Sequence, residues 1–481
     1  MQFLKKESVY NNVRLVCVVL MLLYAILRQN VTALQPYLMS DILNVLVMAA
    51  AGLLFVWDLA FFRNGIRTKY IWILAALFAC TLLSTAIHIR YGLTDNLKAA
   101  ANLFIQFFVL YAVGNKMSRQ RIDREIKVIG TSIGVVWFIA VVISLFMYLA
   151  DITYTQVHSM WGKPTETVQG FVHVQDGAVV MRLWGVFIDP NFAAAVSIIV
   201  ICLSLYILTV SRRKWAKAFH IANIAAQFFY IVLSNSRMAL VVLAVIALVG
   251  GWYLSLPLLK KRRKPGIMQK AVFREAVCLL IGAATLCSCY LCVQVTKKAL
   301  PYVRYGIDVL TSGTASDGES TAPDVEELNR EDIESKDDVS NGRFDLWAGS
   351  IPVFLESPLF GVGPRNYQII ANQIEPEMPI AQKSVHNSYL ELLMGNGAVG
   401  FGLMLVFFVL CVKDAIRQRC RGSRSLFGLC MLMLAVLSCL CCGMFISSLF
   451  YYLSGPSMLI FVLLGYAINL TECEPPVPMS E

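Results

Sequence analysis

Residues 128–150 read VIGTSIGVVWFIAVVISLFMYLA, a run of 23 residues without a charged side chain. A helix rises about 1.5 Å per residue, so this run is long enough to cross roughly 30 Å of bilayer hydrocarbon. Backbone N–H and C=O groups find no water there and must pair within the segment, which favours a helix. The stretch therefore predicts a membrane-spanning helix.

Similar apolar runs recur along the chain. The 481 residues are 58% hydrophobic and 15% charged, whereas soluble domains contain about 45–50% apolar and about 25% charged residues. This composition excludes a soluble enzyme and predicts an all-α, polytopic membrane protein with a bundle of about twelve transmembrane helices. The predicted helices cover residues 15–27, 38–57, 70–88, 99–115, 128–150, 192–210, 219–235, 238–258, 274–295, 388–412, 426–447 and 449–470.

Basic residues gather in alternate connections between these helices. If both termini are cytoplasmic, the segments on that side hold 27 of the 41 Lys and Arg residues, as the positive-inside bias requires. Attraction to an anionic inner leaflet then explains the net charge of +10, and nucleic-acid binding is an unneeded hypothesis. We predict a multi-pass plasma-membrane protein with both termini cytoplasmic.

Two connections on the outer side are much longer than the others, and a loop of about 91 residues is too long to be a mere linker. We therefore expect the functional site there. The second loop contains a stretch rich in Ser, Thr, Asp and Glu, which predicts a mobile acidic insertion at 308–338. The resulting divisions are N-terminal helices, first loop, central helices, large loop, C-terminal helices and tail, over residues 1–150, 151–191, 192–295, 296–386, 387–470 and 471–481.

Metal-binding patterns are weak in this sequence. Cys287, Cys289 and Cys292 have a spacing that zinc ligands can show, but they lie in a predicted span without histidine partners. The acidic insertion lacks the spacing of an EF-hand calcium loop. We expect no metal and no cofactor.

Arginine residues recur where the outer loops meet the helices. Arg182 begins the segment RLWGVFIDPN, which enters a helix directly at Asn191, and SNSR places Arg237 at the outer membrane boundary. An arginine at that depth either snorkels to the surface or binds an anion. Arg343 begins an amphipathic helix predicted for the membrane surface. Its position suits an anion at a helix N-terminus or an exposed cap arginine equally well.

His386 differs in placement from the other four histidines. It precedes the tenth predicted helix at the outer interface, and Asn387 or Ser388 is available as the helix cap. Its position is compatible with a role in proton transfer. Arg182, Arg237, Arg343 and His386 all belong, on this topology, to the outer side of the membrane.

Four motifs in this order carry a family resemblance. They are RLWGVFIDPN, SNSR followed by an apolar helix, GRFDLW with a downstream PLFGVG, and HNSYLELLMGNGAVG. Over about residues 182–400, the chain closely resembles the O-antigen ligase and O-antigen polymerase superfamily of bacterial membrane glycosyltransferases. The earlier predicted helices match that superfamily only in general hydropathy.

The resemblance implies a metal-independent transfer of a glycan from undecaprenyl diphosphate to a hydroxyl on a sugar, lipid or protein. Arg182, Arg237 and Arg343 would hold the diphosphate, and His386 would lie beside the acceptor hydroxyl. Supporting positions would be Asn191, Arg365 and Asn387, although Arg365 matches no fixed position of the family.

Guanidinium groups can replace a metal by stabilising a leaving diphosphate, and a neutral histidine can accept a hydroxyl proton. We therefore predict direct displacement with inversion on the outer face of the bacterial plasma membrane. Asp189 is the nearest carboxylate to the motifs, but its place before Pro190 favours a helix cap.

Nothing in the motifs separates a polymerase of repeat units from an O-antigen ligase or a protein O-oligosaccharyltransferase. We favour the polymerase, with a chain-length regulator as a candidate partner, because no soluble domain is appended. A lipid-linked-glycan flippase is the alternative from another class, since twelve helices also suit a transporter. Against it, the sequence shows no internal repeat and its largest loop falls late in the chain.

Overall fold

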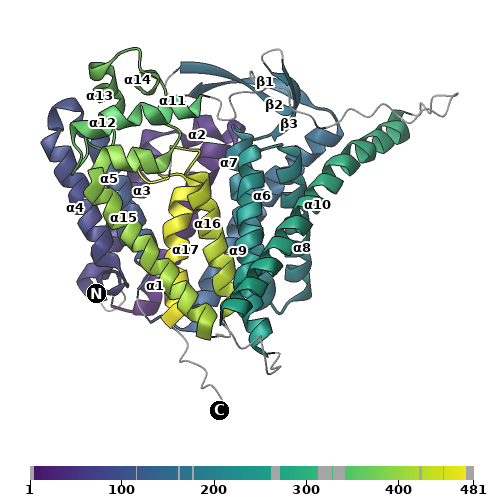
Figure 1. The fold of residues 1–481 in the computed structure, drawn as a ribbon, viewed down its shortest axis with the longest axis horizontal. Coiled ribbons are helices and arrows are strands. Elements are labelled where there is room, and N and C mark those ends of the chain that lie inside the picture. Colours follow the sequence, from purple (N-terminus) through teal and green to yellow (C-terminus); the bar gives the residue numbers. More distant parts are fainter. Residues whose placement is uncertain are drawn as a thin grey trace.

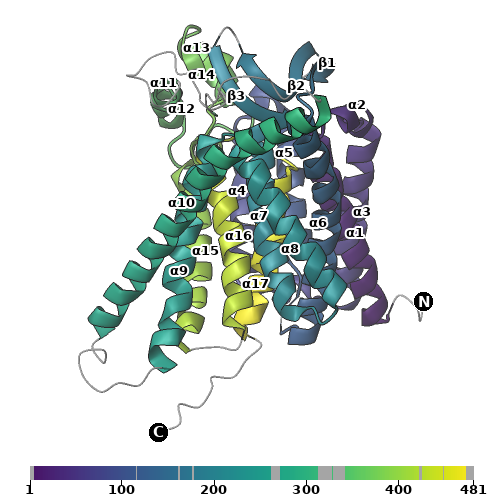
Figure 2. The same cartoon turned by 90° about the vertical axis from the view of Figure 1, so that its right-hand side faces the viewer.

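The computed structural model describes residues 5–114, 116–160, 163–175, 178–261, 271–312, 328, 342–421, 425–447 and 449–472. Long helices form an upright bundle, and a small sheet and several short helices cover one end of it (Figures 1 and 2). The first helix begins and the last helix ends at the opposite end (Figure 1).

Nine helices in the described part of the chain are long and apolar enough to cross a membrane. Two shorter apolar helices accompany them, and a twelfth segment is an α-helix that continues into a π-helical run. The nine are α1 (Glu7–Asn30), α3 (Asp41–Phe61), α6 (Arg119–Leu149), α7 (Pro190–Val210), α8 (Lys214–Leu233), α9 (Arg237–Lys261), α10 (Ala271–Ser312), α15 (Ser388–Arg421) and α17 (Gly455–Glu472). The other three segments are α4 (Ile71–Ile87), α16 (Leu426–Cys442), and α5 (Leu93–Phe104) with the π-helical run Ile105–Tyr111.

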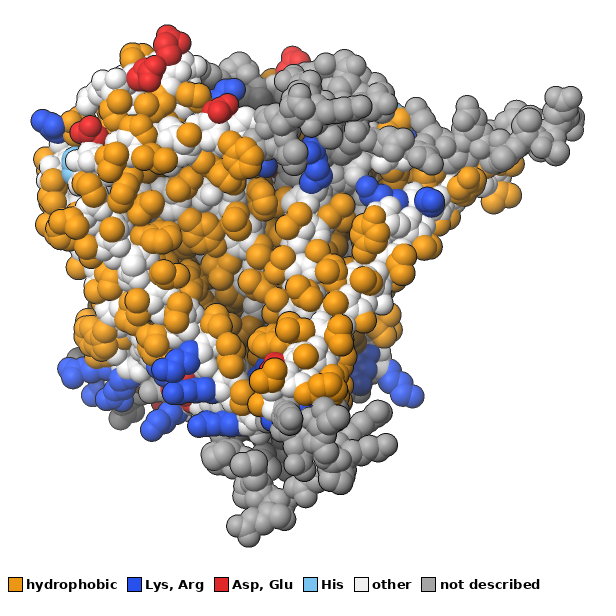
Figure 3. Space-filling view, in the orientation of Figure 1, with side chains coloured by type: hydrophobic (Ala, Val, Ile, Leu, Met, Phe, Trp, Pro, Cys, Tyr) orange, Lys and Arg blue, Asp and Glu red, His pale blue; other side chains and the backbone are white. Residues whose placement is uncertain are grey.

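Each range predicted as a helix overlaps one of these segments, and a polytopic helical bundle is what the structure contains. Length and composition qualify nine described helices as membrane spans, so a count of twelve crossings stays a prediction. Figure 3 shows hydrophobic side chains over the middle of one face and Lys and Arg side chains around the end where α1 begins. This distribution fits a bundle embedded in a bilayer with one basic surface.

Helix α17 lies at the centre of the bundle (Figure 1). Every residue from Gly455 to Leu470 is buried, including polar ones such as Ser457 and Asn469. Helices α1, α6, α15 and α16 and the π-helical run all pack around it. A helix that is apolar on all sides belongs in the core of a large bundle rather than against lipid.

The described chain is largely helical, as the all-α prediction requires, and one three-stranded antiparallel sheet is added to it, covering the end of the bundle above α6. The sheet consists of β1 (Thr153–Met160), β2 (Lys163–Gln175) and β3 (Ala178–Gly185). Gly185 ends β3 with φ of 62°, and a Cβ there would collide with Ser144 of α6. Since glycine alone avoids this contact, the end of β3 can lie directly on the bundle.

Helix α10 corrects the predicted start of the large loop. We expected a span at 274–295 and a loop from residue 296, but the helix continues to Ser312 through Pro301. At about 1.5 Å per residue, its 42 residues extend about twice the thickness of the hydrocarbon. It runs obliquely across α8 toward the sheet (Figure 2), where Arg304 pairs with Asp151 at 2.6 Å. Most of the predicted insertion at 308–338 lies outside the described residues.

The described residues 342–386 of the large loop form four short helices over the same end of the bundle as the sheet. They are α11 (Arg343–Ala348), α12 (Ser350–Glu356), α13 (Tyr367–Ile374) and α14 (Pro379–Gln382). The amphipathic helix predicted from Arg343 is thus two helices, because Gly349 interrupts it. Phe344, Ile351 and Leu355 remain exposed, as expected for an apolar face at a membrane surface.

The segment between α12 and α13 docks on a kink in α15. Gly397 has φ of 65° inside α15, and the PLFGVG turn hydrogen-bonds along this helix, with Val362 N donating to Met394 O at 2.8 Å. Gly361 has φ of 75°, and a Cβ there would overlap the backbone of Gly395 and Asn396. The two glycines therefore allow the loop and the kinked helix to approach closely.

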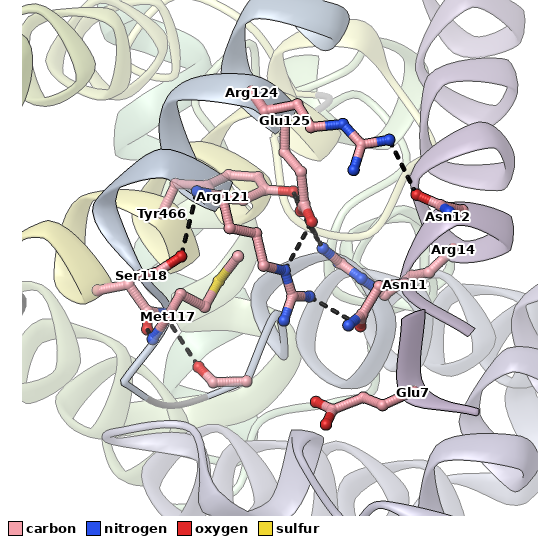
Figure 4. Close-up of polar contacts among 12 residues, drawn as sticks. Glu7, Asn11, Asn12, Arg14, Met117, Ser118, Arg121, Arg124, Glu125 and Tyr466 are labelled. Carbon is pink, nitrogen blue, oxygen red and sulfur yellow. Dashed lines mark hydrogen bonds and ion pairs between the residues drawn. The ribbon is translucent and has the colours of Figure 1, made fainter. Parts of the chain in front are cut away.

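A buried ion pair joins three helices at the basic end (Figure 4). Arg14 of α1 donates to Glu125 of α6 at 2.8 Å and to the hydroxyl of Tyr466 of α17 at 3.0 Å. The Tyr466 hydroxyl donates to the same carboxylate at 2.6 Å, and Arg121 donates to its other oxygen at 2.8 Å. Arg14 and Glu125 are 2% and 3% exposed, so each depends on the other for compensation of its charge.

We expect Glu125→Ala to lower the free energy of unfolding by about 3–5 kcal/mol, because it leaves the Arg14 guanidinium buried without its carboxylate. Denaturant unfolding in detergent micelles measures this change. Asp95→Ala is the control, because its ion pair with Lys98 is exposed and should contribute little. Equal stability of the two variants would contradict the assignment of this pair as a structural link.

Candidate functional site

Arg182 lies at the junction of three segments at the end of the bundle that carries the sheet. It is 8% exposed, and its Nε donates to the carbonyl oxygen of Ser234 at 2.7 Å. One Nη donates to Asn191 Oδ1 at 2.6 Å, and the same oxygen accepts a bond from Ser236 Oγ at 2.8 Å. The predicted residues Arg182 and Asn191 thus fix the SNSR turn between α8 and α9, which presents Arg237.

Asp189 caps α7 at this junction. Its carboxylate accepts a hydrogen bond from Asn191 N at 2.7 Å, and Pro190 occupies the first helical turn. A carboxylate at a helix N-terminus is favourable because unpaired N–H groups point toward it. The capping role expected for Asp189 is therefore what the structure has.

Arg237 and Arg343 begin two different helices, α9 and α11, and both side chains are half-buried. Burial lowers the pKa of the Arg343 guanidinium, Arg237 lowers it further, and Asp189 opposes both effects. Because such effects fall off with distance, the two arginines and Asp189 lie within electrostatic reach of one another. Arg343 also lies over the ring of Phe445, 5.6 Å from its centre.

His386 faces the same region from the segment before α15. Its side chain is exposed, yet removal of water by the surrounding protein lowers its pKa below the ordinary 6.5. The positive charge of Arg343 lowers this pKa further, as does that of Lys383, and Asp189 raises it. The imidazole is therefore neutral at pH 7, in the form that can accept a proton.

The backbone at His386 is in the left-handed region, with φ of 47°. The segment is held in place because Ser384 Oγ donates to Ser447 Oγ at 2.6 Å, and Ser388 N donates to Gly443 O at 2.8 Å. Asn387 caps α15, its Oδ1 accepting a bond from Tyr389 N at 3.0 Å. Of the two caps expected, Asn387 is therefore the one that caps the helix. Its side chain has a structural role next to His386.

Hydrogen bonds join Arg182 to Asn191 and Asn191 to Asp189. Arg343 and His386 lie within electrostatic reach of Asp189, and Arg237 lies within reach of Arg343, so five of the seven predicted residues share one region. Cations are in excess, because three arginines and Lys383 surround one carboxylate. A surface with this balance of charge favours an anionic ligand, and guanidinium groups suit a phosphate in particular.

Arg365 makes its contacts elsewhere. Its guanidinium lies 3.6 Å from the centre of the Tyr452 ring, donates to Tyr451 O at 3.0 Å and approaches Glu391 at 3.9 Å. Its backbone N–H donates to Asn96 Oδ1 at 2.8 Å. The structure therefore assigns Arg365 to a second polar cluster.

Sequence reasoning missed two participants in the site. Lys383 was not singled out, although it lies three residues before His386 and a basic residue so close in sequence could have suggested it. The electrostatic contact of Asp189 with Arg343 and His386 had no signal in the sequence, because it joins segments about 150 to 200 residues apart.

We expect Arg343→Gln to raise the pKa of His386 toward 6.5, because it removes a positive charge that disfavours the imidazolium. NMR titration of labelled histidine measures this pKa directly, and the chain contains five histidines. Arg90→Gln, which removes an exposed arginine outside the cluster, is the matched control. If His386 titrates at the same pH in both variants, Arg343 does not act on it.

Comparison with known protein families gives an independent result. Residues 222–405 match a family model described as O-Antigen ligase, a range that includes Arg237, Arg343 and His386. The comparison with curated proteins found no match. The resemblance predicted from the four motifs is thereby confirmed, and residues 222–405 of the chain are similar to the O-antigen ligase family.

Proposed function

We propose that this protein is a polymerase that joins oligosaccharide repeat units carried on undecaprenyl diphosphate into a surface polysaccharide. Similarity of residues 222–405 to the O-antigen ligase family indicates a membrane enzyme of the ligase or polymerase type. The donor in this proposal is a lipid-linked glycan, and the acceptor is a hydroxyl of another repeat unit. A chain-length regulator is a candidate partner.

The observation that carries this proposal is the proximity of Arg343 and His386 beside Asp189. A transfer from a diphosphate requires a cationic site for the leaving group and a neutral base for the incoming hydroxyl. Arg343 and Arg237 supply the first, and the lowered pKa of His386 supplies the second. The two requirements are met at one place at the end of the bundle that carries the sheet.

In the proposed reaction, the acceptor hydroxyl oxygen attacks the anomeric carbon of the donor glycan and its proton moves to His386. The bond from the anomeric carbon to the diphosphate oxygen breaks, and undecaprenyl diphosphate leaves with its electron pair. Arg237 and Arg343 stabilise the negative charge that develops on the leaving oxygens. Charge-assisted hydrogen bonds of this kind contribute about 1.5–3 kcal/mol each.

Arg182 contributes mainly by position in this scheme, because its donors bond to Ser234 and Asn191. Asp189 caps α7 and is not a free nucleophile, so a single displacement with inversion at the anomeric carbon is the simplest course. The carboxylate also limits the repulsion among the three arginines before the diphosphate binds.

The proposed location is the outer face of a bacterial plasma membrane. The helix arrangement puts the sheet and α11–α14 at one end and the basic residues of α1 and α6 at the other. If the basic end is cytoplasmic, as the positive-inside bias favours, the candidate site faces outward. Both termini then lie on the cytoplasmic side.

An O-antigen ligase is the second candidate, and the description of the matching family favours it. The donor half of the reaction is the same, and the acceptor hydroxyl then belongs to a lipid. Deletion of the gene followed by sizing of the surface glycan distinguishes the two. Single repeat units support the polymerase, whereas unattached polymer supports the ligase, and unglycosylated protein indicates a protein acceptor.

We expect His386→Asn to reduce the transfer rate by about 10²–10⁴, because it removes the general base. Asparagine tolerates the left-handed backbone at this position, so the fold should persist. Arg343→Gln should reduce the rate by about 10–10², the loss expected for one charge-assisted hydrogen bond. Transfer of labelled lipid-linked glycan by purified protein is the measurement.

Arg90→Gln again serves as the control, since it removes an exposed outer-loop arginine without touching the site. It should retain full activity, and all variants should elute as monodisperse protein. Full activity of His386→Asn would exclude the imidazole as the base.

We expect a chelator to leave the transfer rate unchanged, because guanidinium groups carry the charge stabilisation in this proposal. Purified protein is assayed with and without excess EDTA. Strong inhibition, restored by a divalent cation, would show that a metal ion takes part and would overturn the metal-independent mechanism.

A further inference from the structure

Glu391 is a buried carboxylate for which the proposed reaction has no use. It lies in the first turn of α15 and is 0% exposed. Neither of its oxygens has a donor in good hydrogen-bond geometry among the described residues. The hydroxyl of Tyr452 lies nearby, and Arg365 is 3.9 Å away. A buried carboxylate normally has several donors, because the loss of hydration is costly, so this group is short of partners.

Two neighbouring side-chain amides, those of Asn102 and Gln106, also have buried oxygens without hydrogen-bond donors among the described residues. Asn102 Nδ2 donates to Tyr451 O at 2.9 Å, and Gln106 Nε2 donates to Tyr452 O at 2.8 Å. These bonds fix the orientation of both amides, because only nitrogen can donate to a carbonyl. Asn102 Oδ1 and Gln106 Oε1 are buried and accept no hydrogen bond within the described part of the chain.

Arg365 ties these groups into one cluster. It donates to the same Tyr451 carbonyl oxygen as Asn102, at 3.0 Å, while its other Nη approaches Glu391. Its side chain is 21% exposed and stacks on the ring of Tyr452. Arg365 is therefore the member of the cluster that reaches the surface.

The cluster also lies close to the segment that carries His386. Glu391 N donates to Asn387 O at 3.0 Å, so Glu391 lies one turn of α15 beyond the residue that follows His386. The pKa of Tyr367 is raised to about 12, chiefly by burial and also by the charge of Glu391, while a hydrogen bond with Ser384 opposes the rise. Tyr367 thus lies between Glu391 and the segment that carries His386.

The chemistry of an occupant follows from the atoms that lack partners. All four are acceptors, namely both oxygens of Glu391 and the amide oxygens of Asn102 and Gln106, so a ligand must present donors. The cluster already holds a cation, Arg365, 3.9 Å from Glu391, so an uncharged ligand suits it better than a further ion. Hydroxyl groups beside an aromatic ring are the features of a neutral sugar. Gln106 moreover lies in a π-helical run, a geometry frequent at functional sites.

We propose that Asn102, Gln106, Arg365 and Glu391 form a subsite that binds hydroxyl groups of the acceptor glycan. This inference rests on the proposed function, because it identifies the acceptor side of the same reaction. The subsite holds the sugar whose hydroxyl is presented to His386, while Arg237 and Arg343 hold the donor diphosphate. Glu391 is here a binding residue and takes no proton from the reacting hydroxyl.

The first experiment is steady-state transfer by purified protein in nanodiscs with the acceptor concentration varied. Glu391→Gln should raise the acceptor KM by about tenfold and leave kcat and the donor KM within twofold, because it removes a charge-assisted acceptor. Glu125→Gln is the matched control, as a buried glutamate paired with an arginine at the other end of the bundle. It should leave the acceptor KM unchanged.

A double variant separates binding from a purely structural ion pair. Arg365→Gln/Glu391→Gln removes both charges at nearly constant volume, so a structural role predicts recovery of the acceptor KM relative to Glu391→Gln. A binding role predicts that the acceptor KM stays raised. Recovery in the double variant, or an unchanged acceptor KM in folded Glu391→Gln, overturns the proposal.

Binding without transfer keeps this inference separate from the proposed function. The probe is the oligosaccharide released by mild acid from the lipid-linked glycan of the same cells, followed by saturation-transfer NMR without lipid donor. Wild type and His386→Asn should bind it, and Glu391→Gln should bind it about tenfold more weakly. Binding with no transfer activity refutes the proposed function alone, whereas no binding to wild type means that the cluster holds water only and refutes the subsite.

Discussion

The candidate site depends on the hydrogen bonds of Arg182, a guanidinium that is almost fully removed from solvent. One donor fixes Ser234 at the end of α8, another fixes Asn191 at the start of α7, and the backbone of Arg182 itself belongs to β3. Three segments distant in sequence are thereby held at one point. Because a buried cation without acceptors is very unfavourable, the three segments have one arrangement that satisfies it. Arg237 and Asp189 take their positions from that arrangement.

The sequence predicted the helical bundle well, because apolar runs of bilayer length leave the backbone no alternative to a helix. Motifs at the ends of loops also singled out Arg182, Arg237, Arg343 and His386, and their role in binding a diphosphate stays a prediction. The sequence did not predict the sheet at 153–185 or the extension of α10 to Ser312, because both depend on contacts with other elements. Arg365 was grouped with the site from its position after a glycine turn, but the docking of that turn on α15 carries it to Glu391.

Two Arg–Glu pairs in the described part of the bundle differ in how their charges are satisfied. At the basic end, Glu125 receives bonds from Arg14, Arg121 and Tyr466, as expected of a pair that serves only to hold helices together. At the other end, Glu391 has a single cation at 3.9 Å and no donor in good hydrogen-bond geometry among the described residues. The carboxylate of Glu125 is thus fully hydrogen-bonded within the protein, whereas that of Glu391 retains capacity to accept further hydrogen bonds.

The burial of α17 has a consequence for biosynthesis. This helix follows all the others in the chain, yet α1, α6, α15 and α16 pack around it, and Tyr466 completes the bonds of Arg14 and Glu125. Helices that are synthesised earlier enter the bilayer before α17 is available to pack between them. During this time, Arg14 and Glu125 lack the hydrogen bonds of Tyr466. Final packing is therefore set by the arrival of the last helix, and insertion and assembly are separate events in time.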